Sequence, residues 1–288
     1  RYMHQFFALN FSFTDRSKKI VAPIKTKLLP QCALPAYKQI NYDFEELCSN
    51  RARWLIDHAK ETNRKLCVMY SGGIDSTLIV VSVLKVATEK ELKENIIICM
   101  NDMSINENPL FYSEYISKRC KVESSYSFNK IQGNDKYVIV NGEGGDQLFG
   151  SAAMDKIIKD FGKDMATAEP TYENIYKIFS RYIENEYAAD RITNTLSRIV
   201  RGAPIDIDTV FHYFWWINFT TKWQSVYLRS VTYTHPDFMK TLKLEDNYFI
   251  FFNTKEMQLW TMNNPDKLIK DSWSSYKFLC KDIIDRKS

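Results

Sequence analysis

The stretch LCVMYSGGIDSTLIVV, residues 66–81, runs from an apolar segment into two glycines and then, past an acid and a serine, into a second apolar segment. Leu66–Tyr70 is short and apolar, as buried strands are, whereas the segment that begins at Ser76 is long enough for a helix. The chain has only nine glycines in 288 residues, and Gly72 and Gly73 stand together here. The stretch therefore predicts a strand, a tight loop and a helix in succession.

Alternation of strands and helices continues on the carboxyl side of this stretch. Three more strands are predicted, at Ile96–Met100, Val122–Phe128 and Tyr137–Asn141. Helices are predicted over Ser76–Glu94 and from Pro109 onward. Such alternation favours a parallel sheet with helices on both faces. We therefore expect an α/β fold.

The rest of the chain differs from this core. Phe44–Glu61 has the apolar spacing of a helix, and the aromatic and apolar segments within residues 4–24 suggest a hairpin. Beyond the core, strand signals fade and helical periodicity dominates. We divide the chain into an N-terminal hairpin and helix, an α/β nucleotide-binding core and a mainly helical region, at residues 1–60, 61–150 and 151–288.

The composition is that of an ordinary globular protein, with 45% hydrophobic and 26% charged residues. The 39 basic and 35 acidic residues are mixed along the chain and basic clusters are no longer than pairs, so we expect no nucleic-acid partner. Six scattered cysteines without metal-site spacing favour a reducing compartment. No apolar segment has transmembrane length and no signal peptide is recognisable, so we expect a cytoplasmic protein that does not contact membranes.

The loop Ser71–Ser76 is predicted to bind phosphate. Ligands of an open parallel sheet bind beyond the carboxyl ends of the strands, which is where this loop lies. Its glycines let backbone N–H groups approach an oxyanion, the following helix N-terminus favours negative charge, and the hydroxyls of Ser71 and Ser76 can donate hydrogen bonds. Asp75 would repel phosphate, but it would fit a site in which it holds a divalent cation. The alternative is a plain strand-to-helix turn with Asp75 or Ser76 as the N-cap.

The loop has neither the Walker A pattern nor the dinucleotide-binding pattern. SGGIDS instead resembles the PP-loop signature of the ATP pyrophosphatases, which cleave ATP between its α and β phosphates. A second loop, Asn141–Gly150 (NGEGGDQLFG), holds four of the nine glycines. It resembles the GEGxDE-(L/V)-FGG stretch of asparagine synthetases and of β-lactam synthetase. Residues 251–260 and 275–284 resemble, more weakly, the PFLDxxxVEFA…KxxLR run of the same family.

This resemblance implies a set of site residues. Asp75 and Asp146 would bind Mg²⁺ on the pyrophosphate of ATP, and Glu143 would lie near the substrate carboxylate or amine as a polar or acid–base group. The backbone around Gly142 would lie near the adenosine, and Met100 is counted among the nucleotide-binding residues. The implied reaction activates a carboxylate as an acyl-adenylate, releases pyrophosphate and forms an amide with ammonia or an amine.

Three features depart from the family pattern. Gln147 stands where the family usually has Glu, which removes a negative charge beside Asp146. The family's catalytic lysine follows the KxxLR region, whereas here Lys287 is close to Lys277 and the sequence stops at residue 288. Residues 1–60 do not contain the glutaminase domain with its N-terminal Cys. Ammonia would then come from solution or from a separate glutaminase.

Two other functions stay open. One is a PP-loop enzyme that modifies a base or a tRNA. Two observations disfavour it: the sequence has no zinc-spaced cysteine cluster or paired catalytic cysteines, and it does have the second glycine loop. The other is an ATP-binding regulatory or interaction protein without turnover, which Gln147 and the unassigned catalytic lysine suggest.

The helical half is the region expected to recognise the acid. It contains three tryptophans near Lys222 and Arg229, namely Trp215, Trp216 and Trp223. Tryptophans in an apolar helix are expected in the core, whereas Arg229 is a candidate for holding a substrate carboxylate.

Overall fold

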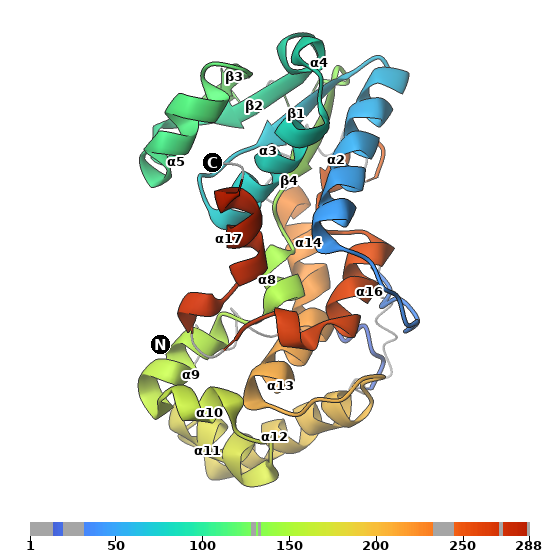
Figure 1. Cartoon of the computed structure of the whole chain (residues 1–288). Coiled ribbons are helices and arrows are strands. Elements are labelled where there is room, and N and C mark those ends of the chain that lie inside the picture. The colour runs from blue at the N-terminus through green and yellow to red at the C-terminus, as the bar shows by residue number, and fades with distance from the viewer. Residues whose placement is uncertain are drawn as a thin grey trace. The chain divides into compact units, whose positions relative to one another are not determined.

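Five parallel strands form a single sheet in the computed structural model, which describes residues 14–19, 32–127, 131, 134–232, 245–270 and 273–286 (Figure 1). The strands are β1 Lys65–Met69, β2 Ile96–Met100, β3 Lys121–Ser124, β4 Tyr137–Asn141 and β5 Tyr248–Ile250. Their order across the sheet is β3-β2-β1-β4-β5, and each neighbouring pair is parallel. The expected α/β fold with a parallel sheet is confirmed.

The predicted strands agree closely with the structure in the centre of the sheet and differ at its two edge strands, β3 and β5. β2 and β4 have the predicted bounds, and β1 begins one residue early. β3 ends at Ser124 and a 3-10 helix, Ser125–Ser127, follows it, so the strand predicted as far as Phe128 was too long. β5 was not predicted, because it is only three residues long and is stabilised by pairing with the distant β4.

Both faces of the central strands are covered, which explains why their sequences are continuously apolar. On one face Cys67, Cys99, Ile139 and Tyr248 pack into a cluster with Ile131. Residues that alternate with these, such as Leu66 and Val68 of β1, are also completely buried. The long helices α2 and α3 contact β1.

Helix α2 has the predicted bounds, whereas the predicted helix over Ser76–Glu94 is two helices. α3 ends at Val86, and Thr88 opens α4 with a capping box that includes Glu91. The helix predicted from Pro109 exists, as a short α-helical turn and a π-helix, and an unpredicted helix, α5, precedes it. The bounds in this part are α2 Phe44–Glu61, α3 Ile74–Val86, α4 Glu89–Glu94, α5 Asp102–Glu107, α6 Pro109–Phe111 and the π-helix Tyr112–Ile116.

After the second glycine loop the described residues are mainly helical, as predicted. One helix, α8 Gly145–Phe149, lies within the second glycine loop itself. The helices that follow are α9 Ala153–Phe161, α10 Lys163–Thr167, α11 Tyr172–Tyr182, α12 Glu186–Arg201, α13 Val210–Ile217, α14 Trp223–Thr232, α16 Lys255–Asn263 and α17 Phe278–Asp285. A π-helix, Asn218–Lys222, joins α13 to α14, and short 3-10 helices lie at Pro265–Lys267 and Trp273–Ser275. Trp215, Trp216 and Trp223 are buried, which confirms that they belong to the core.

The chain forms two compact units, each built from separate segments. The first contains the described residues up to Ile40 together with Asp146–Leu228 and Gln258–Phe278. The second contains Asn41–Gly145, Arg229–Met257 and the described residues from Leu279 onward, and it includes the whole sheet. Most of the hairpin predicted within residues 4–24 lies outside the described residues.

All six cysteines are free thiols, and four of them are buried. Cys67 and Cys99 are two of these, and they serve as small core residues of β1 and β2. Among the helices of the described ranges, none is both long and apolar enough to cross a membrane.

Candidate functional site

The two glycine-rich loops meet at the carboxyl edge of the sheet. β1 and β4 are adjacent and parallel, so the loops that follow them leave the same edge. A Cβ atom on Gly145 would lie 2.5 Å from the carboxyl carbon of Asp75, and one on Gly142 would lie 3.2 Å from the backbone nitrogen of Ser76. The second loop therefore packs directly on the first turn of α3. This close packing requires glycine at position 145, because any side chain there would overlap the Asp75 carboxylate.

Gly72 is needed for two independent reasons. Its φ of +87° lies in the left-handed region, which side-chain-bearing residues rarely adopt. A Cβ there would also lie 2.6 Å from the carbonyl oxygen of Ser104 and 2.5 Å from Cβ of Glu107. Gly73 is different, since a Cβ at that position would meet only the Ser71 hydroxyl oxygen, at 3.5 Å. The first glycine is thus fixed by the close packing of α5, and the second is not.

The hydroxyl groups of the first loop stabilise the loop itself. The Ser76 hydroxyl donates to the carbonyl oxygen of Gly73 at 3.0 Å and accepts from the Ser71 N–H at 3.1 Å. The Thr77 hydroxyl also donates to the carbonyl oxygen of Gly73 at 3.0 Å. Ser76 is only 4% exposed, whereas Ser71 is exposed at the surface. Of the two hydroxyls that were expected to meet phosphate, Ser71 is the accessible one.

Helix α3 begins without a side-chain cap. Its N-cap is Gly73, so the alternative in which Asp75 or Ser76 caps the helix is wrong. Both residues lie inside the first turn. An amino terminus without a capping side chain offers its first N–H groups to an anion.

Glu143 of the second loop is paired with the arginine that was expected to hold a substrate carboxylate. The Arg229 guanidinium on α14 donates a short hydrogen bond to the Glu143 carboxylate, and the two side chains are 47% and 31% exposed. The Glu143 N–H donates to Oδ1 of Asn141 at 3.1 Å, and Nδ2 of Asn141 donates to the Tyr248 hydroxyl at 2.9 Å. The buried Asn141 thus anchors the loop that carries this exposed ion pair.

Asp146 belongs to the first unit, where its carboxylate pairs with a lysine that was not predicted as a site residue. The Lys277 ammonium donates to Oδ1 of Asp146 at 2.8 Å, and the Tyr276 hydroxyl donates to the same oxygen at 3.0 Å. The Asp146 side chain is 58% exposed, whereas that of Lys277 is 5% exposed. The sequence signal for this contact was the weak resemblance of residues 275–284 to the KxxLR run, a segment that contains Lys277.

Gln147 and Met100 are both core residues. Nε2 of Gln147 donates to Oδ1 of Asn218 at 3.3 Å, and Nδ2 of Asn218 donates to the carbonyl oxygen of Gly150 at 2.8 Å. The amide at position 147 therefore has a structural partner inside the first unit. Met100 is 2% exposed at the end of β2, so a nucleotide at this edge would meet its backbone rather than its side chain.

Within the described ranges, no three His, Cys, Asp or Glu side chains gather closely enough to hold a metal ion. Magnesium bound with a nucleotide does not require such a group, because it takes one or two carboxylates and completes its shell with phosphate oxygens and water. Asp75 and the exposed Asp146 are each carboxylates of the type that such magnesium uses, and their joint role stays a prediction.

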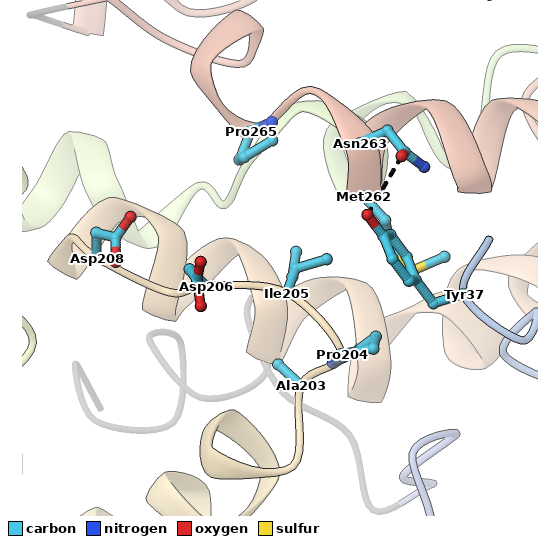
Figure 2. A pocket seen from close by; sticks show the side chains of 9 residues that line it. All are labelled: Tyr37, Ala203, Pro204, Ile205, Asp206, Asp208, Met262, Asn263 and Pro265. Carbon is cyan, nitrogen blue, oxygen red and sulfur yellow. Dashed lines mark hydrogen bonds between the residues drawn. The ribbon is translucent and has the colours of Figure 1, made fainter. Parts of the chain in front are cut away.

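A cavity of about 570 Å³ in the first unit lies apart from these residues (Figure 2). Its lining is Tyr37, Ala203, Pro204, Ile205, Asp206, Asp208, Met262, Asn263 and Pro265. The Tyr37 hydroxyl donates to Oδ1 of Asn263 at 3.3 Å across one side of it. The predicted site residues are not part of this lining.

No protein-family model matches the chain, and no curated protein matches it. The resemblance to asparagine synthetases therefore rests on the residues of the loops and the tail, and the activity that it implies stays a prediction.

Proposed function

We propose that the protein binds Mg·ATP at the carboxyl edge of its sheet and uses it to join a carboxylate to ammonia or an amine. The observation that carries this proposal is the contact between the two loops, in which Gly145 leaves just enough room for the Asp75 carboxylate. A simple strand-to-helix turn does not need a second glycine-rich loop packed against its first carboxylate. Such packing suits a polyphosphate site, in which the acid has to face the metal without blocking the phosphates.

The first loop would bind the pyrophosphate part of ATP. The uncapped amino terminus of α3 supplies N–H groups and positive potential, and the exposed Ser71 hydroxyl can add a hydrogen bond. Asp75 and Asp146 are the proposed carboxylate ligands of magnesium, which would offset the negative charge of the leaving pyrophosphate. The contribution of the protein to catalysis would be positioning and charge neutralisation.

The reaction would have two steps, of which the second would take place near Glu143 and Arg229. In the first step a carboxylate oxygen attacks the α-phosphorus and pyrophosphate leaves with the electrons of the broken P–O bond. Ammonia or an amine then attacks the carbonyl carbon, AMP leaves, and the nitrogen loses a proton. Arg229 has the charge to orient a carboxylate, and Glu143 has the chemistry to accept that proton once Arg229 has turned to the substrate.

ATP–pyrophosphate exchange with Mg²⁺ and a panel of carboxylic acids tests the activity. We expect exchange that depends on one class of acid and is lost in Asp75→Asn, while Asp164→Asn, a change at an exposed carboxylate of α10, leaves it unchanged. Exchange that persists in Asp75→Asn would contradict the proposal. ATP binding that depends on Asp75 without exchange for any acid would instead support the alternative of a nucleotide-binding protein without turnover.

A further inference from the structure

Lys277 is buried in a way that lysines seldom are. The residue is 4% exposed, and lysine is almost never buried to this degree unless it is paired. Its φ of +56° lies in the left-handed region, which costs a side-chain-bearing residue free energy and is typical of functional positions. The ring of the preceding Tyr276 stacks on Trp273, with centroids 4.4 Å apart and planes at 10°. These features hold the ammonium group at a defined point.

The partner of this ammonium group is accessible. Asp146 accepts hydrogen bonds from Lys277 and Tyr276 on Oδ1, yet its side chain is 58% exposed. A cation from solution can therefore approach a carboxylate whose charge is already balanced by a buried lysine. Any divalent cation at Asp146 would lie within a few ångströms of a positive charge.

We propose that Lys277 is the resident counter-ion of Asp146 and determines that this carboxylate accepts a divalent cation together with a polyphosphate rather than alone. The inference rests on the proposed function, which gives Asp146 the role of a magnesium ligand. Free Mg²⁺ is repelled by the ammonium group and competes with it for the carboxylate. A metal–polyphosphate complex brings negative charge that attracts the same ammonium group. Lys277 thus weakens the binding of the free metal and strengthens that of the metal–nucleotide complex.

Binding of Mn²⁺, which prefers the same oxygen ligands as Mg²⁺, tests this inference when free Mn²⁺ is counted by electron paramagnetic resonance. We expect Lys277→Met to bind free Mn²⁺ about tenfold more tightly than the wild type, since a nearby positive charge has been removed. Binding of Mn²⁺ with a non-hydrolysable ATP analogue should weaken about tenfold in Lys277→Met, because the ammonium group that attracts the polyphosphate has been removed. Lys277→Arg keeps the charge and should resemble the wild type, as should Lys267→Met, a change at an exposed lysine of the same unit.

Two further variants make the test specific. Asp146→Asn combined with Lys277→Met should lose the gain in free Mn²⁺ binding, because the gain is assigned to that carboxylate. Lys277→Gln, which keeps a polar side chain, provides the same charge change if the methionine variant does not fold. Loss of the lysine leaves Asp146 mostly solvated, so no isolated charge becomes buried. Unchanged Mn²⁺ affinity in Lys277→Gln and Lys277→Met, or a gain that survives Asp146→Asn, would overturn the inference.

The outcome separates this inference from the proposed function. A wild-type protein that fails to bind ATP contradicts the proposed function, while a gain of Mn²⁺ binding at Asp146 in Lys277→Met still supports the counter-ion role. Conversely, ATP binding that needs Asp75 together with unchanged Mn²⁺ affinity in the lysine variants supports the function and overturns the counter-ion role.

Discussion

At the scale of single residues, Gly145 is the position that makes the Asp75 carboxylate fit. We predict that Gly145→Ala weakens Mg·ATP binding at least tenfold and lowers the free energy of unfolding by about 1–3 kcal/mol, since the methyl group overlaps the carboxylate. Lys163→Ala, a change at an exposed residue of α10 that is not among the predicted site residues, is the control. Calorimetric titration and urea unfolding measure the two effects. Equal nucleotide affinity in the two alanine variants would contradict the account of the site.

Gln147 is a second residue whose role differs from the one expected from sequence. The departure from the family's Glu was expected to alter the metal site, but the side chain is 5% exposed and donates to Asn218. We predict that Gln147→Glu lowers the free energy of unfolding at pH 7 by about 1–3 kcal/mol, because it buries a carboxylate against an amide oxygen. Urea unfolding measures this change, and Gln147→Met, which removes the charge and the amide together, is the comparison. A Gln147→Glu variant as stable as the wild type would show that the amide is not needed there.

At the scale of elements, Glu91 joins the start of α4 to α2. Its carboxylate accepts from Arg53 at 2.9 Å and from Lys60 at 2.9 Å, and it also closes the capping box with Thr88. The Arg53 guanidinium holds the pKa of the Glu91 carboxyl well below its usual range. A carboxyl with a lowered pKa in the folded state stabilises the protein above its unfolded pKa and loses this effect as the pH falls below it.

We therefore predict that Glu91→Gln lowers the free energy of unfolding by about 1–3 kcal/mol at pH 7. The difference from the wild type should shrink as the pH falls below about 4.3, the usual pKa of an unfolded glutamate. Urea unfolding at several pH values measures this difference. Glu61→Gln, a change at an exposed residue at the end of α2, should show no such trend. A difference that stays constant down to pH 3 would contradict the assignment.

Elements whose signals are local were predictable from sequence. α2 has an Asp43 cap and a regular apolar face, and β2 and β4 are short continuous apolar segments, so their bounds could be read directly. The break between α3 and α4 was missed because a capping box is a short signal inside a long helical pattern. β5 was missed because its stability comes from pairing with a strand more than 100 positions earlier in the chain.

The candidate site divides in the same way. The two loops were predicted because glycines and acids are concentrated within ten residues in each. The pairing of Asp146 with Lys277 joins residues 131 positions apart, and that of Glu143 with Arg229 joins residues 86 positions apart. Nothing in the local sequence states which lysine or arginine such an acid will meet, so these contacts required the structure.

At the scale of the whole molecule, the chain divides between Gly145 and Asp146, within the second loop. The sheet, the first loop and the Glu143–Arg229 pair belong to one compact unit, and the Asp146–Lys277 pair belongs to the other. Each unit thus contains an acid that is paired with a basic side chain. Within either unit taken by itself, a metal can bind the acid of such a pair while an anion binds its base.

The most direct test of the metal–nucleotide site is calorimetric titration of the wild-type protein with ATP in the presence and absence of Mg²⁺. We predict saturable binding that requires Mg²⁺, weakens at least tenfold in Asp75→Asn and is unchanged in Asp164→Asn. Binding of equal strength without Mg²⁺, or in Asp75→Asn, would contradict the assignment of the glycine loops to a metal–nucleotide site. An absence of ATP binding by the folded wild-type protein would contradict it altogether.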